Sequence, residues 1–481
     1  MKKVNLLAAA VLAAAFAMPA QADYTPNAYF GGYIRSGVSN HHTMKDDPQV
    51  QRFGRLGYEN DTYGEVVLGT DIAKVDDTVW SFQTRFTMKE AYNRDWQPTS
   101  SGDPEKTIFA NREAFLSVKG FLDWDKDATI WAGKRFYRED INITDVYWYN
   151  ISGMGAGVEN FQVGPGKASV AWFRRDDTAD YKWDSSVVHT DGARLANLAS
   201  VNIGDVRYIV PAWDGASFDL RATFYVPTRD TNEGVKQYQH AKDTYKGAQA
   251  YYVALNQGLS TGWNKTVVKY AHGTNANYGV FGNDQWLDRS GASNTAYRWS
   301  LYNFGDTKIT DTFGFFHVIY ATKAGGFDNN YDHLGWDGSH DYNKQHDYNK
   351  QSDKAFQLVV RPYLQLTKMT RLYAEAGFYV ESTKKLSTKA GVDGWAGSDT
   401  TTGQGQKYTL AYAITPDASN FWSRPEFRIY ASYVHGNEYG QDYSTYGSTG
   451  GTVEFKDGYK KTYSGSNNHD FLFGVMGEAW W

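Results

Sequence analysis

The sequence has 481 residues, no cysteine, 49 basic and 54 acidic side chains, and a formal net charge of −5 at pH 7. The absence of cysteine excludes a disulfide framework and thiol chemistry, and the small negative charge gives no support for nucleic-acid binding. Aromatic residues make up 16% of the chain, and after the N-terminal leader no stretch is apolar for long enough to predict a transmembrane helix.

The N-terminus predicts export. Lys2 and Lys3 precede an apolar run from Val4 to Met18, and Ala20-Gln21-Ala22 follows it as a small-x-small site. This pattern is typical of a secretory signal peptide, and the run is too short for a membrane anchor. We therefore expect residues 1–22 to be removed after Ala22, which leaves residues 23–481 as a single domain.

Residues 131–160 predict a strand followed by a loop folded into a wide barrel. Residues 131–137 alternate like a strand, and the following residues are crowded with aromatic and charged side chains before the glycines Gly153, Gly155 and Gly157. Glycine permits tight reversals, and so many rings need a partner surface that a barrel lumen can supply. We predict a constriction loop at 138–160 that narrows the pore with Arg138, Asp145 and Tyr147.

Strict alternation of apolar and polar residues recurs toward the C-terminus, at 371–380, 427–434 and 471–481. These runs have the length of a tilted spanning strand, whereas a soluble sandwich usually has shorter strands with a polar outer face. The terminal Trp481 suits a strand that ends at a membrane interface. At roughly 25 residues for each strand and its connection, the mature chain holds about 18 strands. We predict an all-β protein, a transmembrane antiparallel β-barrel of the bacterial outer membrane.

Polar tracts between these strands offer only weak metal-binding patterns. The repeat HDYNKQHDYNKQ at 340–351 supplies histidines and aspartates, but it lacks a closed ligand set, which favours a solvated external loop. Asp123, Asp125 and Asp127 imitate the start of a calcium loop without its glycine and final glutamate, so a short periplasmic turn is expected. The sequence has no nucleophile elbow or zinc motif. We therefore expect no metal, no cofactor and no enzyme activity.

Two pairs of residues give the expected inner wall its chemistry. Tyr33 with Arg35, and Tyr63 with Glu65, each place a flat ring and a charged group on one face of a strand. Sugar rings stack on aromatic faces, and their hydroxyls bond to charged groups. Polar barrel interiors are often lined in the same way. The residues alone therefore predict a pore and favour a sugar pore only weakly.

Several blocks, in order, resemble the maltoporin family of trimeric, 18-stranded, maltodextrin-selective porins. They are YFGGYIRSG (29–37), RLGYENDTYGEVVLG (55–69), NRDW (93–96), WAGKRFY (131–137), ISGMGAGVEN (151–160), FWSRP (421–425) and the terminal Trp480-Trp481. The similarity is dense over 29–175 and recognisable at 250–275 and 418–481. It implies a homotrimer in outer-membrane lipid, with maltose and maltodextrins as the transported partners.

The resemblance also implies a set of site residues. An aromatic slide for the apolar face of the sugar would consist of Tyr33, Tyr63, Trp96, Trp263, Trp422 and Trp480. A polar track for its hydroxyls would consist of Arg35, Arg55, Glu65, Arg112, Arg138 and Asp145. Tyr147 would be the steric gate, and Trp96 would be the residue that a neighbouring subunit contributes.

The sequence also departs from the family pattern. The first external loop lacks the cysteine pair of many maltoporins and therefore needs another restraint. The loops at 176–250, 325–354 and 436–468 match poorly. A porin for β-glucosides or sucrose, or a non-transport barrel such as an adhesin, stays open as an alternative. The presence of Arg35, Arg112 and Tyr147 favours a narrow maltodextrin channel.

Overall fold

The computed structural model describes twelve stretches of the chain: residues 27–40, 49–59, 61–90, 108–177, 199–228, 249–276, 295–327, 350–387, 397–437, 451–454, 460–463 and 468–481. The predicted signal peptide, Trp96 and the three histidines at 333, 340 and 346 lie outside these residues. Within the described stretches, no helix has the length and apolar character to cross a membrane.

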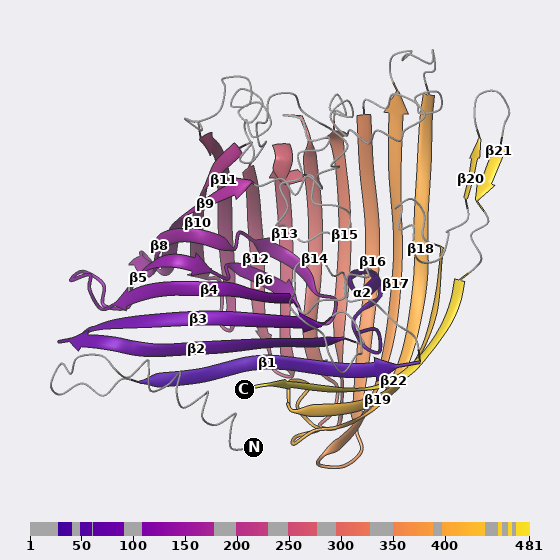
Figure 1. Cartoon of the computed structure of the whole chain (residues 1–481), viewed down its shortest axis with the longest axis horizontal. Helices are drawn as coiled ribbons and strands as arrows, with labels where there is room; N and C mark the ends of the chain where they lie inside the picture. Colours follow the sequence, from indigo (N-terminus) through magenta and orange to yellow (C-terminus); the bar gives the residue numbers. More distant parts are fainter. Residues whose placement is uncertain are drawn as a thin grey trace.

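Eighteen strands form one antiparallel sheet that closes on itself (Figure 1). They are β1 (Ala28–Ser39), β2 (Thr62–Val75), β3 (Thr78–Glu90), β4 (Ile108–Lys119), β5 (Thr129–Arg135), β8 (Gly153–Val163), β9 (Gly166–Asp177), β10 (Ala199–Pro211), β11 (Ala216–Thr228), β12 (Gln249–Leu259), β13 (Gly262–His272), β14 (Tyr297–Lys308), β15 (Phe313–Phe327), β16 (Lys350–Gln365), β17 (Thr370–Ser387), β18 (Gly397–Ile414), β19 (Glu426–Asn437) and β22 (Asn468–Trp480). The first strand, β1, pairs with both β2 and the last strand, β22. The predicted fold class and the strand number are confirmed.

The two faces of this sheet differ in chemistry. In β19, Phe427 and Ile429 are about half exposed, whereas Arg428 and Tyr430 between them are buried. The same alternation sets exposed Phe471 and Phe473 against buried Leu472 in β22. The exposed apolar face is the one that suits lipid, so the buried face, with its charged and tyrosine side chains, lines the inside.

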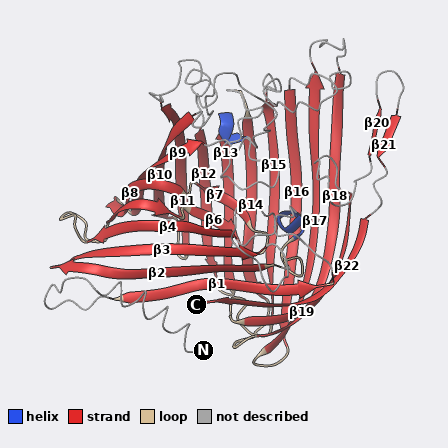
Figure 2. Cartoon of the chain, in the orientation of Figure 1, coloured by secondary structure: helices blue, strands red, loops and turns tan. Residues whose placement is uncertain are grey.

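Among the residues that the structure describes, few elements lie outside the barrel wall. They are the helix α2 (Gln49–Phe53), the 3₁₀ helix η1 (Gly273–Ala276), and the hairpins β6 (Arg138–Ile141) with β7 (Val146–Asn150) and β20 (Gly451–Glu454) with β21 (Lys460–Tyr463). Figure 2 shows helix only as short pieces among the described strands. The first connection of the barrel, which contains α2, contacts β16, β17 and β18.

The C-terminal bound of the predicted constriction loop is wrong. Gly153, Gly155 and Gly157 do not reverse the chain but belong to β8, a strand of the wall. A Cβ at Gly155 would meet the Phe173 ring, and one at Gly157 would meet the Trp131 indole. Gly155 and Gly157 therefore make room for aromatic packing inside the barrel, and the inserted segment is the shorter β6–β7 hairpin.

The aspartate-rich segment between β4 and β5 forms a turn, as predicted. One Asp125 carboxylate oxygen accepts a hydrogen bond from the Gln162 N–H at 2.5 Å, and the other accepts one from the Asp127 N–H at 3.0 Å. The Gln162 N–H holds the pKa of Asp125 below its usual range. Since both oxygens serve the turn, these contacts give the carboxylate a structural role.

Candidate functional site

A continuous line of aromatic rings follows the inner wall. Ring centroids are separated by 5.9 Å between Tyr63 and Tyr33, and by 6.4 Å between Tyr33 and Trp480, which stack at 18°. The line continues from Trp480 to Trp422 at 6.4 Å. The structure therefore brings together four of the predicted slide residues, from four separate segments of the sequence.

Phe316 extends this line to a fifth predicted residue. Its ring lies 5.8 Å from Trp422 and 5.7 Å from Trp263, and its side chain is buried. Tyr63 is near the start of β2, after a long connection, whereas Trp263 follows a two-residue turn, so the line runs between the two rims of the barrel. The sequence analysis missed Phe316, whose only signal is the inward parity that it shares with Val318 and Tyr320.

Beyond Trp263 the line ends at a cavity of about 800 Å³ near the short-turn rim. Trp263 shares the lining with the polar side chains of Asn256, Asn264 and Lys265 and with Trp213.

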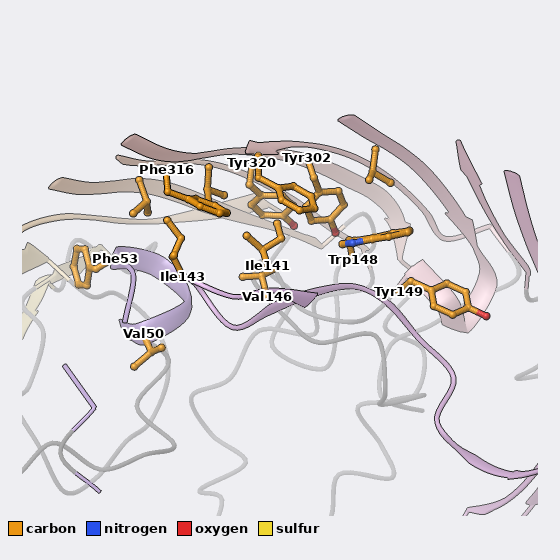
Figure 3. Close-up of a cluster of buried hydrophobic side chains, with 14 of the residues drawn as sticks. Val50, Phe53, Ile141, Ile143, Val146, Trp148, Tyr149, Tyr302, Phe316 and Tyr320 are labelled. Carbon is orange, nitrogen blue, oxygen red and sulfur yellow. The ribbon is translucent and has the colours of Figure 1, made fainter. Parts of the chain in front are cut away.

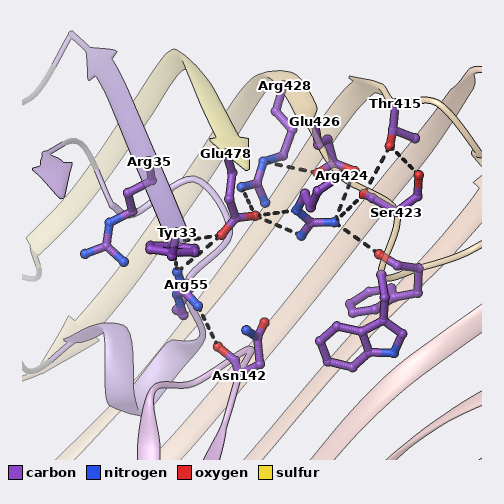
Figure 4. A network of polar contacts seen from close by, with 12 residues as sticks. Tyr33, Arg35, Arg55, Asn142, Thr415, Ser423, Arg424, Glu426, Arg428 and Glu478 are labelled. Atoms are coloured by element: carbon purple, nitrogen blue, oxygen red, sulfur yellow. Dashed lines mark hydrogen bonds and ion pairs between the residues drawn. The ribbon is translucent and has the colours of Figure 1, made fainter. Parts of the chain in front are cut away.

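Charged side chains run beside the rings (Figure 4). The Tyr33 hydroxyl donates to Glu478 at 2.9 Å and accepts from Arg55 at 2.8 Å. Glu478 also pairs with Arg424 at 2.8 Å and Arg428 at 2.7 Å. These last three residues were missed as site residues, although Glu478 shares the inward parity of Trp480, and Arg424 follows Trp422 by two positions.

Arg35 is buried against two carboxylates. Its guanidinium reaches Glu59 at 2.6 Å and Asp61 at 2.8 Å, and it lies 5.3 Å from the centre of the Tyr63 ring. Glu59 and Asp61, which balance this charge, lie just before β2. Arg35 therefore links β1 to the end of the first connection, and it also borders the rings.

A second charged group lies close to the hairpin. Arg85 bridges Glu65 at 2.5 Å and Glu113 at 2.6 Å. The guanidinium carbons of Arg112 and Arg138 lie 4.3 Å and 3.9 Å from the centre of the Phe136 ring. Alternating charges of this kind offer both donors and acceptors to a polar solute.

Arg138, Asp145 and Tyr147 meet on the β6–β7 hairpin. The Tyr147 hydroxyl accepts a hydrogen bond from Arg138 at 2.7 Å and lies 3.3 Å from Asp145. Burial raises the pKa of Tyr147, so the phenol is protonated and can donate. Asp145 adopts a φ of 51°, a left-handed conformation that aspartate tolerates in turns.

The hairpin is fixed to the wall by an apolar side (Figure 3). Ile141, Val146 and Trp148 are buried in one cluster with Phe316 and Tyr320 of the wall. Polar contacts add to this packing: Tyr149 donates to Asp205 at 2.6 Å, and Arg221 pairs with Glu139 at 2.9 Å.

The chain is similar to several known proteins. The sequence model of the LamB porin family matches residues 28–481. Maltoporin 1 of Klebsiella pneumoniae subsp. pneumoniae is 30% identical over 482 residues, which cover 99% of this chain and 98% of the relative. Maltoporin 2 of Yersinia pseudotuberculosis is 31% identical over 466 residues, 94% of this chain and 93% of the relative. Among solved structures, the outer membrane channel DcaP of Acinetobacter baumannii aligns with a TM-score of 0.39 and 12% identity, over 96% of this chain and 99% of that chain.

Proposed function

Since this chain belongs to the LamB porin family, we propose that its lumen conducts maltose and linear maltodextrins by facilitated diffusion. The protein is an outer-membrane channel with a closed 18-stranded barrel. The observation that carries the proposal is the line of half-buried rings Tyr63, Tyr33, Trp480 and Trp422, because stacked sugars need a succession of apolar faces along the channel.

The mechanism follows from weak contacts in series. The rings Tyr33, Trp480 and Trp422 would hold the apolar faces of successive glucose units, while Arg55, Glu478 and Arg424 would exchange hydrogen bonds with their hydroxyls. Centroid spacings near 6 Å let a sugar shift from one ring to the next without leaving the wall. Conduction requires sites that bind strongly enough for entry and weakly enough for exit.

The hairpin would act as the constriction, with Tyr147 as its gate. This role is supported by the contacts of the hairpin with inward side chains of β10 and β11, and by the polar group formed by Arg138, Asp145 and Tyr147. Of the remaining predicted track residues, Arg35 and Glu65 contact Tyr63, and Arg112 lies over Phe136 beside the hairpin.

We also propose a homotrimer, as the family resemblance implies, with Trp96 contributed to the neighbouring lumen. Trp96 lies outside the described residues. Residues 1–22 would be the signal peptide that directs export.

Replacing Trp480 with Ala is expected to weaken maltohexaose block by about 1–3 kcal/mol, if a sugar stacks on this ring as bases stack on aromatic side chains. Ion conductance should stay similar or rise, since ions do not need the ring. Block of single channels in planar bilayers measures both quantities. The matched control is Trp299→Ala, which removes an exposed tryptophan from the outer face of β14. If the Trp480 variant and the wild type had equal affinity for maltohexaose, this ring would not belong to the sugar pathway.

A further inference from the structure

Three charged residues on adjacent strands form a buried row that the predicted track does not include. Lys407 of β18 pairs with Glu375 of β17 at 2.9 Å, and Arg361 of β16 donates to the other Glu375 oxygen at 2.7 Å. The side chains of Lys407 and Glu375 are fully buried. Burying charged groups costs free energy unless each one is paired or hydrogen-bonded. The bonding partners of these side chains therefore indicate the role of the row.

The partners are backbone groups on both sides of Arg55. Lys407 Nζ donates to the carbonyl of Gly54 at 2.5 Å and to that of Leu56 at 2.8 Å. The Leu56 N–H donates to Glu375 at 3.2 Å. An ammonium group has three N–H donors, and two carbonyls and one carboxylate match that number.

Glycine permits this close approach. Gly54 has a φ of 94°, which L side chains rarely adopt. A Cβ at this position would lie 2.7 Å from a Glu375 carboxylate oxygen. Gly54, the residue before Arg55, can therefore lie directly against the Glu375 side chain.

Arg55 in turn joins the parts of the constriction. Its N–H donates to the Ile143 carbonyl at 2.9 Å, and its guanidinium donates to the Asn142 carbonyl at 3.0 Å and to the Tyr33 hydroxyl at 2.8 Å. Arg55 thus touches both the hairpin and a ring of the slide, and its position depends on the peptide groups that Lys407 holds.

We propose that Lys407, together with Glu375, is a positioning residue that aims Arg55 at the sugar pathway. This inference rests on the proposed function, because it treats Arg55 as a group that meets the sugar. It also identifies the restraint that the cysteine-free first connection was expected to need. Other contacts remain without Lys407, including the pair of Arg52 with Glu381 at 2.7 Å, so the segment should shift rather than leave the lumen.

The first test is a double-mutant cycle on maltohexaose block. Lys407→Met and Arg55→Met should each weaken block about tenfold, the loss expected when one charge-assisted hydrogen bond is misaligned. Maltohexaose block of the double variant should be no weaker than block of the Arg55→Met variant. Arg298→Met is the matched control, since Arg298 is a fully buried cation that binds the Ala276 carbonyl and Asp353, away from Arg55.

The second test does not use sugar. The chain has no cysteine, so Val50→Cys places a single thiol at a buried position of α2. Its labelling by a charged thiol reagent should become several-fold faster when Lys407→Met is added and stay unchanged with Arg298→Met.

The two readouts separate the two claims. If maltohexaose blocks neither the wild type nor any variant, the proposed function fails. Faster labelling of Val50→Cys with Lys407→Met would still support the positioning role in that case. The role of Lys407 would be overturned if the losses of block in the double-mutant cycle were additive. It would also be overturned if Lys407→Met left both block and labelling unchanged.

Discussion

Replacing Trp148 with Ala is expected to release the hairpin from the wall and raise ion conductance. Trp148 is fully buried, and its ring lies 4.7 Å from the Arg221 guanidinium carbon and 5.1 Å from Lys265 Nζ. Truncating a buried tryptophan costs about 3–5 kcal/mol, whereas each hydrogen bond of the hairpin contributes about 1 kcal/mol. The packing loss is therefore larger than the contribution of any single polar contact of the hairpin.

Single-channel recording checks this expectation, with maltohexaose block measured on the same channels. Block should fall as conductance rises, because a released hairpin no longer holds Arg138 and Tyr147 at a fixed place in the lumen. Trp124→Ala serves as the control, since Trp124 is an exposed residue of the turn between β4 and β5. A Trp148→Ala channel with wild-type conductance and wild-type block would show that the hairpin is held by other contacts.

Replacing Tyr147 with Asp is expected to widen the opening and admit bulkier disaccharides. The substitution removes a ring and places a second carboxylate beside Asp145, where the phenol now lies 3.3 Å away. Two carboxylates two residues apart repel each other, so the opening should widen and let sucrose pass. Tyr147→Phe keeps the ring and loses only the hydroxyl, so sugar passage should be unchanged or slightly faster.

Liposome swelling with sucrose, measured beside thermal melting of the purified protein, distinguishes a gate from a packing residue. A gate predicts faster sucrose entry for Tyr147→Asp. If sucrose entry is unchanged while the melting temperature falls, Tyr147 only packs against the wall, and the lower stability reflects a buried carboxylate.

The strands were predictable because alternation is a local property. In parts of β17, β19 and β22, at 372–380, 427–433 and 471–475, every second residue is apolar and faces outward, so a short window of sequence is enough to assign them. The site needs more information, since parity says which residues point inward but not which of them meet. Phe316 shares its parity with many wall residues, and only the closed register places it between Trp422 and Trp263.

One error of interpretation and one feature that the sequence analysis missed have physical causes. Glycine marks tight reversals and also close packing, and at Gly155 and Gly157 packing against Phe173 and Trp131 decides. The inward fold of the first connection had no local signal, because it depends on Glu375 and Lys407, more than 300 positions away in the sequence.

The most direct test of the central claim is single-channel current through the wild-type protein, titrated with maltohexaose, cellobiose and sucrose. A slide of rings with charged groups beside it predicts reversible block by maltohexaose at much lower concentrations than by either disaccharide, with the sugar recovered intact. Equal or stronger block by cellobiose or sucrose would contradict a maltodextrin channel.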